Sequence, residues 1–146
     1  MAPYHDAMTQ SDNIRHILTT CRTVAVVGLS PKPHRDSFDV ARYMQAHGWR
    51  IIPVNPVAAA SGEPILGEKV YATLLEAAQH EKIELVNVFR NSADVPPVAQ
   101  EAIAIGAQAL WLQLGIENAA AASAAQAAGL RVVQNKCLLV EHAASL

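Results

Sequence analysis

Residues 23–28 read Thr-Val-Ala-Val-Val-Gly and lead into a polar loop that runs from Leu29 to Ser37. The run is apolar, rich in β-branched side chains and ends abruptly in glycine, which is typical of a strand buried on both faces of a parallel sheet. Apolar residues then recur at helical spacing over residues 38–47, and Gly48 can end that helix. A strand, a loop and a helix in this order predict the first unit of an alternating α/β fold.

The same alternation continues along the chain. Further strands are predicted at residues 49–54, 84–89, 109–113 and 130–133, with a very short one at 70–72, and further helices at residues 73–80, 96–105 and 117–128. Crossovers between parallel neighbours are almost always right-handed. The pattern therefore predicts a Rossmann-like, doubly wound parallel sheet in a single three-layer α/β domain.

Three segments carry expectations of their own. Pro53 indicates that its strand lies near an edge of the sheet or close to its own end. The stretch between Asn55 and Lys69 is rich in Ala, Pro, Gly and Ser, and we expect a mobile loop there. Residues 1–22 are predicted to form an N-terminal helical extension, capped by Ser11 or Asp12, that packs on a domain of residues 23–146.

Composition excludes several classes of protein. The chain has 146 residues, 51% of them hydrophobic, and a formal net charge of -2, which gives no global positive field for nucleic acid or an anionic membrane. No uncharged apolar run reaches the roughly 18 residues of a membrane span, and no signal peptide is evident at the start. Cys21 and Cys137 belong to no metal or disulfide pattern, and the six histidines show no ligand spacing. We expect a soluble cytoplasmic protein without a metal site.

Ligands of such sheets bind beyond the carboxyl ends of the strands. The residues there are cationic and rich in amides: Gly28 to Lys32, Asn55-Pro56, Arg90-Asn91, Leu114-Gly115 and Asn135-Lys136-Cys137. Gly28 would let a phosphate approach the backbone, and Ser30 can donate its hydroxyl to it. Lys32 and Arg35 add positive charge, and the amides entering the next helix at residues 36–38 favour an anion. No carboxylate pair suited to acid–base chemistry is evident, so a phosphate ligand is favoured.

The fingerprint of ordinary dinucleotide binding is incomplete. It requires G-x-G-x-x-G and an acidic residue about twenty positions further on that holds the ribose hydroxyls. Of the three glycines only Gly28 is present, and the second predicted strand ends in Val54-Asn55-Pro56. The sequence disfavours a nicotinamide cofactor, and an NAD(P)-type Rossmann oxidoreductase stays as an alternative.

Several motifs in one order resemble a known family. They are Val26-Val27-Gly28-Leu29-Ser30-Pro31-Lys32-Pro33, Ile52-Pro53-Val54-Asn55-Pro56, Gly67-Glu68-Lys69-Val70-Tyr71, Val86-Asn87-Val88-Phe89-Arg90, Trp111-Leu112-Gln113-Leu114-Gly115, and Asn135-Lys136-Cys137 before Glu141. Over residues 23–141 the chain resembles the small bacterial CoA-binding proteins, whose domain is related to the nucleotide-binding domain of the succinyl-CoA synthetase alpha subunit. It departs from them at Asn135-Lys136, where the family would have Asp-Arg before the cysteine.

The resemblance implies a site for coenzyme A or an acyl-CoA. Gly28, Ser30, Lys32 and Arg35 would hold the phosphates, Asn55-Pro56 would line the nucleotide cleft, and Phe89-Arg90 would flank the adenosine or pyrophosphate. With their neighbours, the candidate cofactor-binding residues are Gly28, Leu29, Ser30, Lys32, Arg35, Ser37, Asn55, Pro56, Phe89, Arg90, Gly115 and Cys137. No catalytic and no metal-ligating residue is assigned.

These observations predict a non-catalytic CoA-binding protein that acts as a carrier, sensor or accessory module, because the second domain that CoA chemistry usually requires is missing. The rival enzyme reading is a Cys137-dependent thiol or acyl transferase, in which Lys136 would lower the pKa of the thiol. Against it, free cysteines are most often small buried hydrophobes. An interaction module with a vestigial cleft is the third reading. The expected partner is a small-molecule nucleotide, not nucleic acid or a membrane, and a homodimer or an unknown protein partner stays open.

Overall fold

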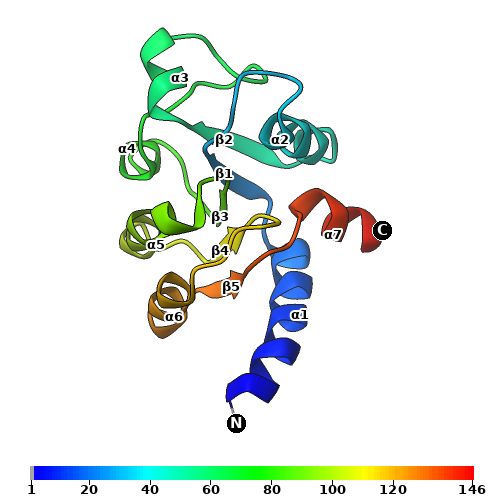
Figure 1. The fold of residues 1–146 in the computed structure, drawn as a ribbon. Helices are drawn as coiled ribbons and strands as arrows, with labels where there is room; N and C mark the ends of the chain where they lie inside the picture. The colour runs from blue at the N-terminus through cyan, green and yellow to red at the C-terminus, as the bar shows by residue number, and fades with distance from the viewer. Residues whose placement is uncertain (1) are drawn as a thin grey trace.

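The computed structural model describes residues 2–146, and for residues 2–9 only their backbone. Within them, five parallel strands form one sheet in the order β2-β1-β3-β4-β5. The strands are β1 (Thr23–Val27), β2 (Arg50–Val54), β3 (Leu85–Val88), β4 (Ala109–Leu112) and β5 (Arg131–Val133). The helices are α1 (Ala2–Thr20), α2 (Asp36–Ala46), α3 (Pro56–Ser61), α4 (Leu74–Ala78), α5 (Val95–Ala104), α6 (Ala119–Ala127) and α7 (Leu138–Ala144), with a 3-10 turn η1 (Ser92–Asp94). Helices α4, α5 and α6 cover one face and α1, α2 and α7 the other (Figure 1), which confirms the predicted Rossmann-like architecture.

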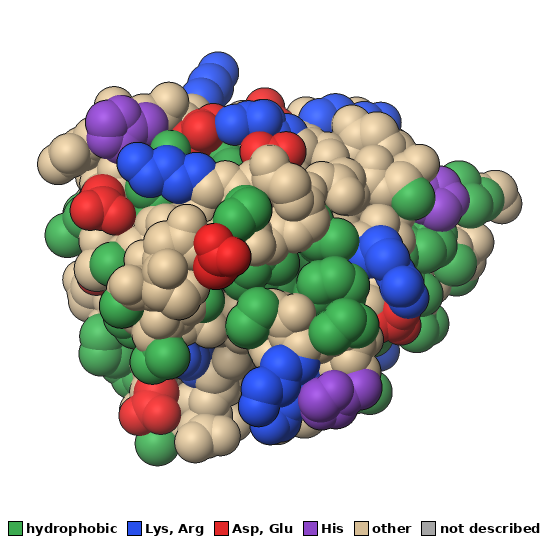
Figure 2. All heavy atoms as spheres, turned by 90° about the horizontal axis from the view of Figure 1, so that it is seen from above, with side chains coloured by type: hydrophobic (Ala, Val, Ile, Leu, Met, Phe, Trp, Pro, Cys, Tyr) green, Lys and Arg blue, Asp and Glu red, His purple; other side chains and the backbone are tan. Residues whose placement is uncertain are grey.

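The surface carries both signs of charge. On the face seen in Figure 2, acidic and basic side chains are interspersed and no continuous basic field covers it. No helix in the described part of the chain is both long and apolar enough to cross a membrane.

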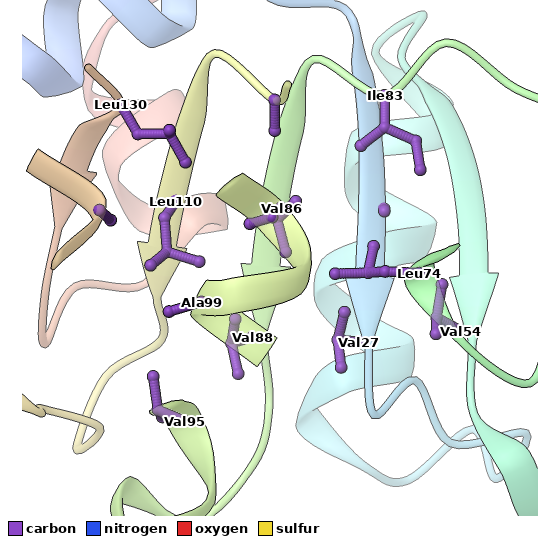
Figure 3. Packing of buried hydrophobic residues seen from close by; sticks show 14 of the residues in the cluster. Val27, Val54, Leu74, Ile83, Val86, Val88, Val95, Ala99, Leu110 and Leu130 are labelled. Atoms are coloured by element: carbon purple, nitrogen blue, oxygen red, sulfur yellow. The ribbon is translucent and has the colours of Figure 1, made fainter. Parts of the chain in front are cut away.

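The strands are apolar throughout because helices cover both faces of the sheet. Alternate side chains of β1 enter different cores: Ala25 and Val27 pack toward α4, α5 and α6, and Val24 and Val26 pack toward α1, α2 and α7. Figure 3 shows the first core, in which Leu74 of α4 lies near Val27 and Val54, and Ala99 of α5 lies near Val88 and Leu110. Strand alternation thus divides a continuous apolar run between two layers of helices.

β2 is an outer strand, as Pro53 predicts. Beyond it, the predicted strand at residues 70–72 is wrong, because only Tyr71 forms a bridge, with Val54. The Tyr71 N–H donates to the Pro53 carbonyl at 3.0 Å, and the Asn55 N–H donates to the Tyr71 carbonyl at 2.9 Å. Thr73 then caps α4 through the Glu76 N–H, so the chain turns away after one residue of pairing.

The opposite edge strand, β5, is covered by α1. The Asn13 side chain donates to the Val132 carbonyl at 3.0 Å, and the Gln10 side chain both donates to and accepts from the backbone of Gln134 at 3.0 Å. The side chains of α1 thus bond to backbone groups at this edge of the sheet, which would otherwise be open to pairing with another strand. The helix begins at Ala2, so the expected cap at Ser11 or Asp12 is wrong.

Two further helices differ from the sequence expectations. The expected loop at residues 55–69 contains α3, because the Asn55 side chain accepts from the N–H groups of Val57 and Ala58 at 3.0 and 3.1 Å. Pro56 at the first helical position needs no N–H partner there. The chain after Cys137 forms α7, whose Leu138 is fully buried. Six- and seven-residue helices of this kind depend on packing and capping more than on intrinsic propensity.

Candidate functional site

The strand order changes direction at β1, which makes a crevice at the carboxyl edge of the sheet. From β1 the chain passes to β2 on one side and later to β3 on the other, so the loops after β1 and β3 diverge. Two cavities lie there, of about 420 Å³ and about 760 Å³. Asp36 and Phe89 line both cavities, and we treat them as one cleft with a narrow end and a wide end.

The narrow end is surrounded by residues of the β1–α2 loop and by the residue after β3: Gly28, Ser30, Lys32, Arg35, Asp36, Ser37 and Phe89. The wide end is lined by residues from α2, from the loops after β3 and β4, and from the start of α7: Asp36, Asp39, Val40, Phe89, Arg90, Asn91, Ser92, Gln113, Leu114, Gly115, Ile116, Cys137, Leu139 and Val140. Residues far apart in the sequence therefore meet along one cleft, as the carboxyl ends of parallel strands require.

Gly28 is required at the floor of the narrow end. Its φ is +92°, and a Cβ built there would lie 2.3 Å from the Phe89 carbonyl oxygen. The Gly28 N–H donates to the Val54 carbonyl at 2.8 Å, and the Phe89 N–H donates to the Val27 carbonyl at 2.8 Å. The exits of β1 and β3 are thus held against each other at a distance that only glycine permits.

The β1–α2 loop is shaped by its own hydroxyls. Ser37 Oγ accepts from the Ser30 N–H at 3.0 Å, and Ser30 Oγ accepts from the Lys32 N–H at 3.1 Å. Both oxygens hold the loop, and each hydroxyl keeps its hydrogen for another acceptor. The two serines predicted to touch the ligand therefore also organise the turn around it.

The start of α2 offers free donors to the narrow end. Arg35 is the N-cap residue and makes no side-chain capping bond. Among the described residues, the N–H groups of Asp36 and Ser37 donate to no protein acceptor. Exposed Lys32 and Arg35 add positive charge, and the carboxylate of Asp36 opposes it. Free amides, a helix dipole and two cations favour an anionic ligand.

Three predicted site residues line neither end of the cleft: Leu29, Asn55 and Pro56. Leu29 is fully buried, and its carbonyl accepts from Asn55 Nδ2 at 2.9 Å. Asn55 thereby ties the β1–α2 loop to the start of α3, where its Oδ1 caps the helix. Pro56 belongs to the first turn of α3.

The wide end brings together the other predicted residues. Phe89, Arg90 and Gly115 line it, and so does Cys137, a half-buried free cysteine directly before α7. The Gly115 N–H donates to Asn135 Oδ1 at 2.7 Å, and Asn135 itself has a φ of +58°. The loop after β4 and the loop after β5 are thus joined where Gly115 and Cys137 enter the cleft.

Sequence reasoning missed a buried amide pair beneath the wide end. Asn87 of β3 is fully buried, and Gln113 is 6% exposed. Asn87 Nδ2 donates to the Trp111 carbonyl and to Gln113 Oε1, both at 3.3 Å, and Gln113 Oε1 also accepts from the Leu138 N–H at 3.4 Å. Asn87 Oδ1 has no partner in the described structure. The signal was available, since polar residues inside apolar strands need a reason.

The segment before α7 is fastened to β4. Trp111 is fully buried and donates from its indole N–H to the Lys136 carbonyl at 2.8 Å, and the Lys136 N–H donates to the Leu112 carbonyl at 3.4 Å. With the Leu138 N–H on Gln113, three bonds hold the backbone on both sides of Cys137.

No group of three metal-ligating side chains occurs among the residues that the structure describes.

The outer side of α7 packs on α2 through aromatic rings. Tyr43 Oη lies 2.9 Å from His142 Nδ1, and the rings of His47 and His142 are 5.1 Å apart. Burial lowers the pKa of His142 below the usual histidine value, and the positive charges of a protonated His47 and of Arg22 lower it further. A neutral His142 can accept from Tyr43, which stabilises α7 beside the cleft.

Comparison with known proteins agrees with this geometry. A family model described as a CoA binding domain matches residues 22–143. The uncharacterised protein YneT of Bacillus subtilis is 38% identical over 130 residues, which cover 89% of this chain and 92% of that protein.

Solved structures give the same picture. A hypothetical protein from Pyrococcus horikoshii has a TM-score of 0.82 at 38% identity, covering 91% of this chain and 89% of its own. A Thermus thermophilus protein has a TM-score of 0.85 at 33% identity, covering 92% and 98%. A Rex-family repressor, RSP, has a TM-score of 0.56 at 16% identity over 88% of this chain and 58% of its own, which shows the shared fold alone. The match over residues 22–143 and the relatives above 30% identity establish that the chain belongs to the family of CoA binding domains.

Proposed function

We propose that the protein binds coenzyme A, with its phosphates at the narrow end of the cleft and its pantetheine arm in the wide end, directed toward Cys137. The observation that carries the proposal is the continuity of the cleft, because Asp36 and Phe89 line both ends. One end offers free helix amides with Lys32 and Arg35, and the other offers a half-buried thiol. A long ligand with phosphates at one end and a thiol at the other fits this polarity.

The main rival ligand is a nicotinamide dinucleotide. RSP, which shares the fold at 17% identity and a TM-score of 0.54, is known in complex with beta-NADH. In this chain the residue after β2 is Asn55, and its side chain is occupied by Leu29, Val57 and Ala58. Dinucleotide-binding domains have an acidic side chain at this position, which holds the ribose hydroxyls. Here the position has a neutral amide that already makes hydrogen bonds within the protein. This difference supports CoA over NAD.

Isothermal titration calorimetry with CoA tests the proposal. We expect Lys32→Ala and Arg35→Ala each to weaken CoA binding by about tenfold, because each removes a charge-assisted contact worth roughly 1.5 kcal/mol. The matched controls are Lys82→Ala and Arg15→Ala, which remove exposed cations that line neither end of the cleft. Equal losses in variants and controls would refute the phosphate assignment, and tighter binding of NAD than of CoA would refute the ligand.

We infer a role in holding CoA, as a carrier, sensor or accessory module. The bonds to the backbone of Lys136 and Leu138 hold the chain on both sides of Cys137, which supports a fixed binding wall. A Cys137-dependent transferase is the alternative. Rapid single-site alkylation of Cys137 at neutral pH, compared with a Cys137→Ser control, would favour the enzyme, and slow alkylation would favour the binding role. Two free cysteines also support placing the protein in the reducing cytoplasm.

A further inference from the structure

The wide end of the cleft has an apolar side. Leu114 and Val140 line it and are among the large apolar residues that the described structure leaves exposed, at 66% and 55%. Ile116 and Leu139 line the same end. Leu114 and Ile116 come from the loop after β4, and Leu139 and Val140 come from α7. Two separate segments therefore present apolar side chains to one cavity, which is the pattern of a surface that a ligand covers.

A buried side-chain amide, that of Gln113, also lines the wide end. The Leu138 backbone N–H can only donate, so the Gln113 atom facing it is the oxygen, Oε1, and the amide orientation is fixed. Oε1 is held further by Asn87 Nδ2 at 3.3 Å. Gln113 Nε2 donates to no protein group in the described structure. It is also not fully buried, unlike the unpartnered Asn87 Oδ1. Because Gln113 lines the wide end, its free N–H groups face the cavity.

An unpaired amide donor in a ligand cavity favours a ligand that carries a hydrogen-bond acceptor. Gln113 is 94% buried, since its exposed fraction is 6%, and its unpaired Nε2 is not fully enclosed. A ligand in the cavity can therefore reach this donor. Its Oε1 accepts from Leu138 N–H, and Leu138 follows Cys137 directly, so the donor lies beside the thiol side of the cleft. A carbonyl next to a sulfur atom, followed by an alkyl chain, matches both the donor and the apolar wall.

We propose that the preferred ligand is an acyl-CoA thioester with an apolar acyl chain. Gln113 Nε2 donates to the thioester carbonyl, and Leu114, Ile116, Leu139 and Val140 cover the chain. The inference rests on the proposed function, since it extends the same ligand beyond its sulfur atom. The wide end, at about 760 Å³, is within the usual size of a small-molecule site.

Calorimetry with CoA and the acetyl, butyryl, hexanoyl and octanoyl thioesters tests the chain. Full burial of one methylene corresponds to about fourfold in affinity, and at this partly open wall we expect about twofold per methylene. The double variant Leu114→Ser with Val140→Ser should remove this chain-length dependence, so that the variant binds the acetyl, butyryl, hexanoyl and octanoyl thioesters with equal affinity. Its matched control is Leu75→Ser with Val57→Ser, which changes exposed apolar residues that line neither end of the cleft.

The carbonyl contact is tested on the ligand, which avoids disturbing the buried pair. S-octyl-CoA is a thioether that lacks the carbonyl of octanoyl-CoA, and we expect it to bind about threefold to tenfold more weakly. Equal affinity of the two would overturn the role of Gln113.

The outcomes separate the inference from the proposal beneath it. Affinity that rises with chain length in the wild-type protein and the control, but not in the cleft variant, supports the inference. Binding of CoA with no dependence on chain length, or a dependence that the cleft variant keeps, overturns the inference and leaves CoA binding standing. Failure of CoA and all its thioesters to bind overturns both.

Discussion

Gly28→Ala is the substitution for which the structure gives the sharpest expectation. The new Cβ would lie 2.3 Å from the Phe89 carbonyl oxygen, on a residue with a φ of +92°. Neither backbone can withdraw freely, since the Gly28 N–H is bonded to Val54 and the Phe89 N–H to Val27, both at 2.8 Å. The variant must therefore separate the exits of β1 and β3 or break one of these bonds.

The expected loss in the free energy of unfolding has two parts, backbone strain and steric clash, and the same substitution at a second glycine separates them. Gly129 has a φ of +94° and no atom within 4 Å of a built Cβ, so Gly129→Ala carries the backbone strain without the clash. That strain is about 1–2 kcal/mol, offset by about 0.4–1 kcal/mol from the reduced entropy of the unfolded chain, which leaves roughly 1 kcal/mol. Overpacking adds about 1–3 kcal/mol at Gly28. We expect Gly28→Ala to lower the free energy of unfolding by about 2–4 kcal/mol.

Urea denaturation followed by tryptophan fluorescence measures both variants, because Trp49 and Trp111 are buried at 3% and 0% exposure. An unchanged m-value would assign the loss to the native state. In the same samples, Gly28→Ala should weaken CoA binding because the β1–α2 loop moves, and Gly129→Ala should not. A loss at Gly28 no larger than at Gly129 would refute the argument that the strand exits are held rigidly together.

Three further predictions concern charge and the thiol. Asp36→Asn should tighten CoA binding about threefold, because it removes a carboxylate from the cleft. It should also lower the free energy of unfolding by about 0.5 kcal/mol, because the helix-dipole interaction of Asp36 is lost. Weaker CoA binding in calorimetry would contradict the first expectation. With CoA disulfide, the Cys137 thiolate should displace one CoA thiolate and retain the other CoA as a mixed disulfide, seen by intact-protein mass spectrometry and absent in Cys137→Ser; an unmodified wild-type protein would argue against a thiol end at Cys137. The pKa of His142 is lower in the folded protein than in the unfolded chain, so the unfolded chain binds the proton at a higher pH than the folded protein does. The free energy of unfolding should therefore decline as the pH falls below about 6.5. Urea titrations at pH 7.5 and 5.5 should show a smaller decline in His142→Gln, and an identical decline would contradict the role of His142.

The sequence predicted the parts of the fold that depend on local pattern. Short apolar runs located the five strands of the sheet, and Pro53 indicated that β2 lies near an edge or close to its own end. The short helices α3 and α7 were not predicted. In α3 the cap is a side chain, Asn55, whose other end is held by the distant Leu29 carbonyl, and α7 depends on burying Leu138 against the sheet.

The candidate site also has features that local sequence predicts and features that depend on tertiary contacts. Glycine and cationic residues after β1 are visible in the sequence because the chemistry of anion binding requires those residue types near a helix start. Gln113 escaped notice because its significance depends on Leu138, 25 positions away, which fixes its oxygen and turns its nitrogen into the cleft. Leu29 and Asn55 are predicted to contact the ligand, and in the structure they line neither end of the cleft but bond to each other.

The sequence by itself determined that the protein is an alternating α/β domain, that glycine and cationic residues follow β1, and that the residue after β2 is not acidic. Those conclusions depend on side-chain periodicity and on residues close together in the chain. Tertiary structure decided that the narrow and wide ends form one cleft, that Gly28 is pressed against Phe89, and that Gln113 presents a free donor. These features arise where loops from different strands converge, and that convergence depends on the strand order, which local pattern does not encode.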